Sequence, residues 1–362
     1  MKRPAQRSLH VLPTLAERQG ALETCAFCPK LCRGVCPVSN AEPKESLLPW
    51  GKMSTAYAIG LGDLPRTVEA AKGAWACTGC LACQGACDHE NPVADTLLDA
   101  RSALRDVAPT AARRARDGYA AMEREAATLA RGLAAGRGDD LLLLSCLSLR
   151  KAPDVARASL SVAQRTRATA KGDVSVHEGC CGYPLLLAGD REGFLAAATA
   201  LAATAATRRL VVSDPGCHYA LTALSSLTWP TPPTLLLDDA HARLARFGAA
   251  SVDLGPFTYH DPCLLSRGLG RTAEPRALLT HVVGHAPVDG HASGLRGTCS
   301  GGGGLLPLTM PATSHVIATA RAAELPPGTV VTACASSRRA LQKAGRRTLD
   351  LFEVLERAAG TR

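Results

Sequence analysis

Eight of the fifteen cysteines stand in two tight groups near the start of the chain, and this pattern constrains the fold more than any other feature. The first group consists of Cys25, Cys28, Cys32 and Cys36. The second consists of Cys77, Cys80, Cys83 and Cys87, in the spacing C-x2-C-x2-C-x3-C. The first group shares the closing C-x3-C, followed by Pro37, but has one extra residue between its second and third cysteines. Each group therefore predicts a segment of chain that folds around a metal centre bound by its thiols.

Four thiolates at this spacing wrap one 4Fe–4S cubane, so the two groups predict two iron–sulfur clusters. Where two such groups occur together, the fourth cysteine of each binds the other cluster. One predicted ligand set is therefore Cys25, Cys28, Cys32 and Cys87. The other predicted set is Cys77, Cys80, Cys83 and Cys36. Structural zinc and disulfides are the alternative uses of such cysteines.

The composition narrows the class of protein. The chain has 362 residues, enough for two or three domains. No apolar segment follows the basic start, so we expect no secretory signal and a cytoplasmic protein. In that compartment fifteen cysteines indicate metal or redox chemistry rather than a disulfide framework. The formal charge is +9, but aromatic residues do not interleave with the basic ones, so we expect no nucleic-acid partner.

Hydrophobic periodicity divides the chain into four parts. Residues 21–100 hold both cysteine groups and are expected to form an α-helical, two-cluster ferredoxin-like domain. Residues 101–138 are a helical linker, because apolar residues between Tyr119 and Leu133 recur at three and four positions. Two further domains are expected over 139–255 and 256–362.

Short apolar runs alternate with helical segments from Asp139 onward. The runs are Leu141–Leu144, Val174–Val176, Leu210–Val212, Phe257–Tyr259 and Val330–Thr332. The helices are expected near 154–168, 191–207, 234–247, 275–283, 313–324 and 348–358. This alternation is typical of βαβ units, so both later domains are predicted to be α/β domains with parallel sheets.

The remaining seven cysteines form a degenerate tandem repeat. They are Cys146, Cys180, Cys181 and Cys217 in copy one, and Cys263, Cys299 and Cys334 in copy two. Offsets of 117, 119 and 120 residues separate Cys146 from Cys263, Cys180 from Cys299, and Cys217 from Ser337. Most of these cysteines follow predicted strands, and ligand groups gather beyond the carboxyl ends of parallel strands. We therefore expect the thiols of each copy to converge, whereas unrelated core cysteines would explain neither the repeat nor the placement.

Four motifs carry a resemblance to a known family. They are C-C-G-Y-P at 180–184, Y-H-D-P-C-L-L at 259–265, C-S-G-G-G-G at 299–304 and T-A-C at 332–334. These motifs resemble the cysteine-rich CCG domains. Such domains occur in the B and D subunits of heterodisulfide reductase, the iron–sulfur subunit of glycolate oxidase, and the C subunit of anaerobic glycerol-3-phosphate dehydrogenase. Two CCG domains after a two-cluster ferredoxin domain resemble the architecture of the latter group.

The resemblance implies five cysteine slots per copy, which can hold an unusual 4Fe–4S cluster. Copy one fills four slots and has Asp214 in the fifth, so it implies an additional cluster. Copy two has Ser300 and Ser337 in two slots. Hydroxyls are poor ligands for iron, so copy two could hold a cluster with an outside ligand, a zinc ion, or nothing.

Other polar candidates lie near the cysteine slots. His177 and His260 could be ligands or proton relays, but a hydrogen-bonding role that holds a strand end is the preferred interpretation. Gly301–Gly304 lacks the residues that complete a phosphate loop, so we interpret it as a close backbone approach or a tight turn. No flavin or nicotinamide motif is present, so a partner must supply any hydride chemistry.

These observations predict an iron–sulfur electron-transfer subunit of a cytoplasmic oxidoreductase complex. Its expected partner is a flavoprotein dehydrogenase or another redox subunit, and the resemblance implies a quinone, a disulfide or a further protein as acceptor. A membrane partner that reduces quinone would place the chain at the membrane periphery. The alternatives are a thiol–disulfide reductase with a catalytic cluster in the CCG region, and a structural zinc protein.

Overall fold

The computed structural model describes residues 8–28, 30–133, 138–167 and 173–359, which fold into two compact units. Unit 1 combines the N-terminal part of the chain through Asp117 with Pro184–Glu192 and Gly301–Ile317. Unit 2 combines Gly118–Tyr183, Gly193–Ser300 and the C-terminal part from Ala318 onward. The domain ranges expected from the sequence stay a prediction. Within the described ranges, no helix is both long and apolar enough to cross a membrane.

Unit 1 is helical. Its 3-10 turns are η1 (Pro13–Arg18), η2 (Leu31–Gly34), η3 (Glu45–Leu47) and η4 (Arg105–Val107). Its α-helices are α1 (Gln19–Ala26), α2 (Pro37–Ala41), α3 (Pro49–Leu61), α4 (Val68–Trp75), α5 (Ala82–Gly85), α6 (Val93–Ala103) and α7 (Thr110–Asp117). The later segments add α16 (Leu306–Thr309) and most of α11 (Tyr183–Ala188).

Local sequence signals explain why the main helices of unit 1 begin and end where they do. Helix α3 begins with Pro49, whose fixed φ suits the first helical turn. It ends at Gly62, which adopts a left-handed φ of 81°. The Thr67 hydroxyl caps α4 by accepting a hydrogen bond from Ala70 N. Helices α1, α3, α4 and α6 pack together around a continuous apolar core.

Unit 2 contains two parallel sheets. The first has the order β2-β1-β3-β4, with β1 (Asp140–Leu143), β2 (Val174–Val176), β3 (Arg209–Val212) and β4 (Thr234–Leu235). Leu142 in the central strand pairs with Val176 on one side and Val211 on the other. The second sheet has the order β5-β6-β7, with β5 (Phe257–Tyr259), β6 (Thr329–Thr332) and β7 (Thr348–Asp350). The α/β fold expected from the alternating pattern is therefore confirmed for both copies.

The remaining helices belong wholly or mainly to unit 2, except Pro311–Glu324, whose first half belongs to unit 1. They are α8 (Tyr119–Leu133), α9 (Cys146–Lys151), α10 (Pro153–Thr166), α12 (Arg191–Thr204), α13 (Pro215–Tyr219), α14 (Leu236–Ala242), α15 (Ala273–Val283), α17 (Pro311–Glu324), α18 (Ala335–Lys343) and α19 (Leu351–Ala359). Short turns are η5 (Ala220–Leu224), η6 (Leu244–Arg246), η7 (Leu264–Gly268) and η8 (Gly294–Arg296). All six predicted helices are present. Two expected starts were wrong, since Thr234 and Thr348 begin edge strands and the helices follow them.

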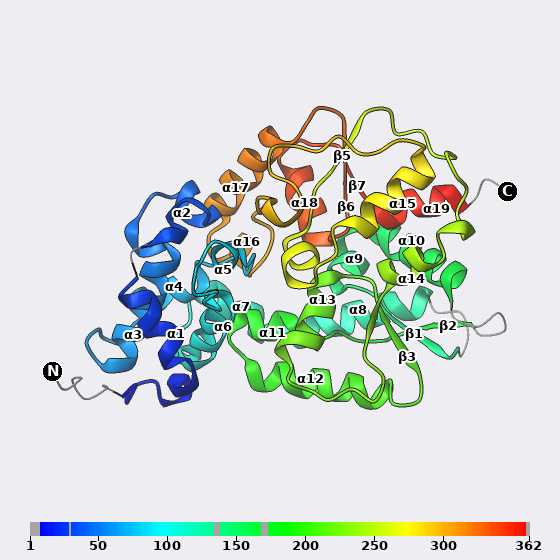
Figure 1. Ribbon diagram of the computed structural model, residues 1–362. Coiled ribbons are helices and arrows are strands. Elements are labelled where there is room, and N and C mark those ends of the chain that lie inside the picture. Colours follow the sequence, from blue (N-terminus) through cyan, green and yellow to red (C-terminus); the bar gives the residue numbers. More distant parts are fainter. Residues whose placement is uncertain (1–7, 29, 134–137, 168–172, 360–362) are drawn as a thin grey trace. The chain divides into compact units, whose positions relative to one another are not determined.

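The two copies pack against each other through reciprocal contacts between equivalent helices. Helix α10 of copy one packs on α19 of copy two, and α14 packs on α15 in the equivalent way (Figure 1). Both sheets contribute to one apolar core. The short helices and turns that follow the strands also make reciprocal contacts between the copies. Helix α13 of copy one contacts η7 of copy two, and α18 of copy two contacts α9 of copy one. This approximate two-fold arrangement brings the carboxyl-end turns of the two sheets together.

Candidate metal centres

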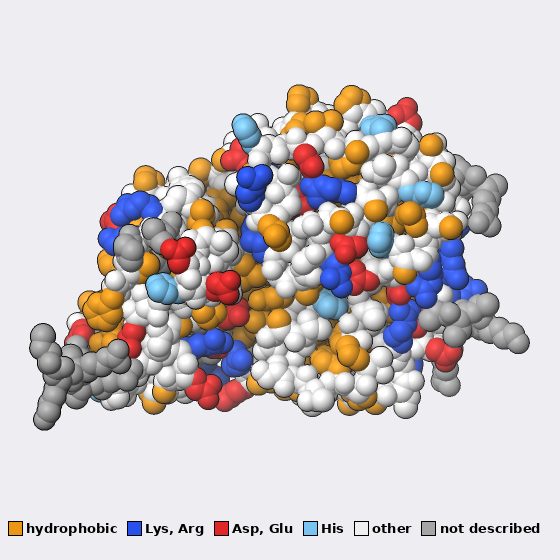
Figure 2. Space-filling view, viewed as in Figure 1, with side chains coloured by type: hydrophobic (Ala, Val, Ile, Leu, Met, Phe, Trp, Pro, Cys, Tyr) orange, Lys and Arg blue, Asp and Glu red, His pale blue; other side chains and the backbone are white. Residues whose placement is uncertain are grey.

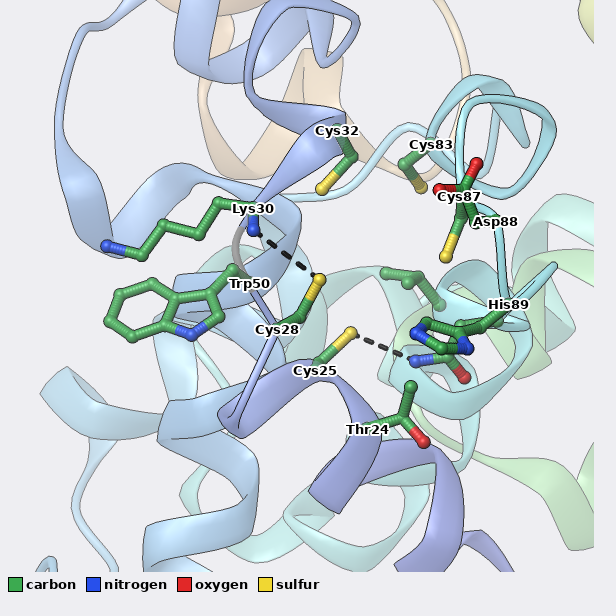
Figure 3. Close-up of a pocket in the computed structure, with 12 residues that line it drawn as sticks. Thr24, Cys25, Cys28, Lys30, Cys32, Trp50, Cys83, Cys87, Asp88 and His89 are labelled. Atoms are coloured by element: carbon green, nitrogen blue, oxygen red, sulfur yellow. Dashed lines mark hydrogen bonds between the residues drawn. The ribbon is translucent and has the colours of Figure 1, made fainter.

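The first predicted ligand set lies around one pocket in unit 1. Cys25, Cys28, Cys32 and Cys87 all line it, together with Cys83, and its volume is about 170 Å³. Figure 3 shows the sulfur atoms of these cysteines directed toward the same space. Cys25 lies in the last turn of α1, whereas Cys87 follows α5, so the pocket joins the two cysteine groups. We call the four cysteines Cys25, Cys28, Cys32 and Cys87 the first centre.

Neutral donors and burial shape the first centre. Asn91 Nδ2 donates to Cys25 Sγ at 3.0 Å, and Lys30 N donates to Cys28 Sγ at 3.4 Å (Figure 3). Burial raises the pKa of Cys25 to about 12, so this thiol needs a cation to lose its proton near neutral pH. The Lys30 ammonium turns away from the sulfurs and lies 4.0 Å over the Trp50 ring.

The second predicted set lies around a separate, smaller pocket. Cys36, Cys77, Cys80 and Cys83 line it, and its volume is about 20 Å³. We call these four cysteines the second centre. Gly79 N donates to Cys77 Sγ at 3.4 Å. Lys52 Nζ donates to Cys36 Sγ at 3.4 Å, and the lysine is only 2% exposed.

The donor sets fit iron–sulfur clusters in their chemistry. Each centre consists of four soft sulfur ligands, which is the donor set that such clusters use. Amide and ammonium N–H groups point at the sulfur atoms, as they do toward anionic thiolates. Among the described residues, no three His, Cys, Asp or Glu side chains are arranged as the ligands of one metal ion.

Arg101 stabilises the backbone of the loop that carries Cys77 of the second centre. It is 1% exposed, and its guanidinium donates to Cys77 O at 2.8 Å and Ala74 O at 2.9 Å. It also donates to Leu187 O and Gly304 O, each at 3.0 Å. One side chain thus joins α4 and the second cysteine group to the two later segments that complete unit 1.

The glycine run beside this loop confirms a close backbone approach. A Cβ on Gly304 would lie 2.1 Å from Cys77 O, and one on Gly303 would lie 2.7 Å from Thr78 O. Gly301 and Gly304 also have φ values of +74° and +65°, which favour glycine. Larger residues would push the Cys77–Thr78 backbone away.

The four thiols of copy one converge at the carboxyl ends of β1, β2 and β3. Cys146 and Cys181 donate hydrogen bonds to Cys180, and Cys181 also reaches Cys217. The hydroxyl of Tyr119 on α8 donates to Glu123 Oε1 at 3.1 Å and also lies within hydrogen-bonding reach of Cys180. These donors hold the pKa of Cys180 well below its usual range. Cys180 is therefore the acceptor that the neighbouring thiols share.

Copy two has a different set of contacts. Ser300 Oγ donates to Ser337 Oγ at 3.1 Å. The two serines that replace cysteines in copy two are therefore hydrogen-bonded to each other. Cys334 lies beside Ser337 at the start of α18, and burial raises its pKa to about 12. Cys299 is buried, and its charge acts on Arg321. Cys263 caps η7 and is partly exposed.

Asp214 connects the two copies. Its Oδ1 accepts from Gly216 N at 2.8 Å and so caps α13, which carries Cys217. Its Oδ2 accepts from Ala335 N of copy two at 3.4 Å. The residue in the fifth slot of copy one therefore caps one helix and touches the first turn of its counterpart.

The two histidine candidates differ in their surroundings. His260 is buried, and its Nδ1 accepts from Arg321 Nε at 3.2 Å. Burial, and then the charges of Arg321 and Arg267, lower the pKa of His260 to about 3. His260 O also accepts from the Thr332 hydroxyl at 3.0 Å, so the residue joins β5 to β6 as expected. For His177, burial lowers the pKa, and its backbone N–H bonds to Leu142 O in β1.

Sequence reasoning missed the polar residues that surround the sulfurs. These are Lys52, Asn91, Arg101 and Tyr119. For Lys52 a signal existed, because it is the one charged residue of the sequence between Leu47 and Gly62. Asn91 and Arg101 carry no such signal, since their partners lie far away in the sequence.

Comparisons with known proteins agree with this geometry. Residues 21–91 match the family described as "4Fe-4S dicluster domain". Residues 141–222 and 257–341 each match the CCG family, described as "Cysteine-rich domain". The chain combines a 4Fe-4S dicluster domain with two CCG domains. It is therefore an iron–sulfur protein, which implies electron transfer in general terms.

One curated relative shows a short similarity. A "Probable membrane-anchored ferredoxin" of Chromohalobacter salexigens is 48% identical over 52 residues. That stretch covers 14% of this chain and 8% of the relative, so the chain spans a small part of that protein. No solved structure matches the chain in this comparison.

Figure 2 shows Lys and Arg at several places on this face, many of them beside Asp and Glu, with one group toward the right side. Ion pairs link several of them, such as Arg33 with Glu45 at 2.6 Å and Arg66 with Asp106 at 2.5 Å. Much of the positive charge therefore has an acidic neighbour.

Proposed function

We propose that the chain is an electron-transfer subunit that moves single electrons between a flavoprotein partner and an acceptor reached through the CCG region. The observation that best supports this is the grouping of the cysteines into two pockets. The second pocket collects three cysteines of the second group and Cys36 of the first. The first pocket collects three cysteines of the first group, with Cys87 and also Cys83 of the second. This is the ligand exchange of two-cluster ferredoxins, so each set would hold one 4Fe–4S cluster.

A bound 4Fe–4S cluster supplies one-electron oxidation and reduction. The chain's own residues supply the rest of the site. Asn91 and the Lys30 backbone direct N–H groups at the first centre, and Lys52 and the Gly79 backbone do so at the second. The apolar residues that line the second pocket, such as Val38, Leu81 and Leu97, shield its sulfurs from water.

Copy one would hold the additional cluster, with Cys146, Cys180, Cys181 and Cys217 as ligands. The support is the convergence of four thiols on three neighbouring strand ends. Copy two would bind iron weakly or not at all, because the Ser300 and Ser337 hydroxyls occupy each other. In this proposal, Cys263, Cys299 and Cys334 are the thiols left for a zinc ion or an incomplete cluster.

The proposed partners are redox proteins that carry a flavin or nicotinamide cofactor. The sequence contains no flavin or nicotinamide motif, so a flavoprotein dehydrogenase or another redox subunit would deliver electrons to the chain. The acceptor would be a quinone, a disulfide or a further protein. The proposal places the chain in the cytoplasm, held at a membrane complex that reduces quinone; the relative's name, which says membrane-anchored, supports only the membrane part of it.

A second candidate function is reduction of a disulfide substrate at copy one. It is favoured by Cys180, whose pKa is held low by donors from Cys146, Cys181 and Tyr119. Such an enzyme would act without a partner once a chemical reductant is supplied. Reduction of disulfides by the isolated chain would therefore favour this function over electron transfer to a partner.

Iron and acid-labile sulfide analysis of the anaerobically reconstituted full chain tests the main proposal. The two centres of unit 1 should account for about eight irons, and copy one for about four more. A colourless protein with about two zinc ions would contradict it. Turnover of 2-hydroxy acids with an artificial dye, and no flavoprotein, would contradict the role as an electron-transfer subunit.

A further inference from the structure

The second centre contains a buried cation that no role in the fold explains. Lys52 lies on α3 with 2% of its surface exposed, and its ammonium is 3.4 Å from Cys36 Sγ. Every other residue that lines this pocket is apolar, a threonine or a cysteine. Lys52 is thus the one lysine or arginine in a lining that contains no carboxylate.

Burial of an ammonium group is unfavourable unless a negative charge compensates it. A neutral Cys36 thiol would supply little compensation. A thiolate held by a metal centre would supply it fully, because four thiolates and a 4Fe–4S core together carry a net negative charge. The position of Lys52 therefore makes sense when the second centre is loaded.

The first centre has no equivalent charge directed at its sulfurs. Lys30 lines that pocket, but its ammonium lies over Trp50 and 3.5 Å from the Glu45 carboxylate. The Lys30 side chain is also 32% exposed, so water screens its charge. Asp88 adds a carboxylate to the same lining. The two centres thus differ in the sign and burial of the charges around them.

We propose that Lys52 raises the reduction potential of the second centre above that of the first, so that an electron entering the chain comes to rest at the second centre. This inference depends on the proposed binding of two clusters. Uptake of one electron, supplied by a reductant such as dithionite, adds one negative charge. No bond forms or breaks, and no proton needs to move. The Lys52 ammonium stabilises the more negative form, and its burial leaves the attraction weakly screened.

The backbone of the second centre lies against a segment that belongs, in the sequence, to the second CCG domain. The Cys77–Thr78 backbone lies against Gly303 and Gly304 within unit 1. The same stretch of chain carries Cys299 of copy two, five residues before Gly304. Lys52 would therefore hold the electron at the centre that directly adjoins a segment from the CCG region.

Redox titration of the reconstituted full chain, followed by the paramagnetic signals of the reduced centres, tests this proposal. Lys52→Met removes the charge at similar volume, and Lys52→Arg retains it. Lys30→Met is the matched control at the first centre. The Cys77→Ser variant identifies which signal belongs to the second centre, since that signal should be lost.

With Lys52→Met, the ratio of reduced to oxidised second centre at the wild-type midpoint should fall about tenfold or more. A tenfold change corresponds to about 59 mV for a one-electron couple. The first centre should shift less, Lys52→Arg should restore most of the change, and Lys30→Met should have a small effect.

Two results would overturn the proposal. One is an unchanged second centre, or an equal shift of both centres, in a Lys52→Met protein that retains its full iron content. The other is a loss of iron from both Lys52→Met and Lys52→Gln, because Lys52 would then be needed to build the site rather than to tune it. A wild-type chain that binds no pair of clusters would instead contradict the proposed function.

Discussion

Replacement of Arg101 by methionine should destabilise unit 1 strongly. The guanidinium makes four hydrogen bonds of 2.8–3.0 Å to backbone carbonyls, from a position that is 1% exposed. A hydrogen bond to a charged group contributes about 1.5–3 kcal/mol, and a carbonyl left without a donor costs about 1–3 kcal/mol. The acceptors can relax in part, so we expect a total loss of about 3–5 kcal/mol, as for a broken buried ionic network.

The loss of cluster absorbance during anaerobic denaturant unfolding would measure this effect, because both centres lie in unit 1. Arg105→Met is the matched control, since Arg105 is 50% exposed and pairs with Glu192 at 3.2 Å. An exposed pair of this kind contributes about 0–1 kcal/mol. Arg101→Lys should fall between the two, because an ammonium keeps the charge but cannot reach all the carbonyls. If Arg101→Met and Arg105→Met unfold alike, the stabilising role assigned to Arg101 is wrong.

Three further predictions concern the separate ligand sets, the iron of the two copies and the pH dependence of stability. Cys77→Ser should remove one paramagnetic signal and about four irons while the first centre remains, and loss of both signals would contradict separate ligand sets. Replacing Cys180 and Cys181 together with serine should abolish the CCG-associated iron, whereas Cys299→Ser should leave most of it; equal losses would mean that copy two also holds a cluster. Burial raises the pKa of Asp350 to about 7, so the folded state favours its neutral form and the free energy of unfolding should fall as pH rises from about 4 to about 7. Asp350→Asn should flatten that fall in denaturant titrations at pH 5 and pH 8, and an unchanged slope would refute the assignment.

Much of the fold follows from local patterns. The spacing of the cysteines and the apolar runs predict the helical region and five of the strands. The two missed strands, at Thr234 and Thr348, are two and three residues long and run directly into helices. Such short edge strands carry no period of their own, and only the neighbouring strand makes them extended.

Local patterns could not predict which segments of the chain make up unit 1. Pro184–Glu192 and Gly301–Ile317 join it although they lie within the CCG region of the sequence. Their attachment depends on Arg101 and on the fit of Gly303 and Gly304 to the Cys77–Thr78 backbone. These are contacts between residues far apart in the chain. A fragment limited to residues 21–100 lacks both segments, so cluster binding is better measured in the full chain.

The candidate centres were predictable in their ligands more than in their surroundings. Cysteine is conspicuous by type and spacing, so the sets that line the two pockets could be written from the sequence. The donors to sulfur could not, because Asn91 reaches Cys25 and Lys52 reaches Cys36 through tertiary packing. Such contacts depend on which face each helix turns toward the pocket.

The reciprocal contacts between equivalent helices of the two copies bear on how this protein could have evolved. A single-copy ancestor could have used the same surfaces to form a symmetric dimer, with α10 of one molecule on the α19 equivalent of the other. Fusion of the two genes would then free one site to lose its cysteines, as Ser300 and Ser337 indicate for copy two. Helices α15 and α19 would remain under selection all the same, because they cover α14 and α10 of the copy that keeps its thiols. Mutations that accumulate in copy two would therefore remove its metal-binding cysteines long before they removed the fold of that domain.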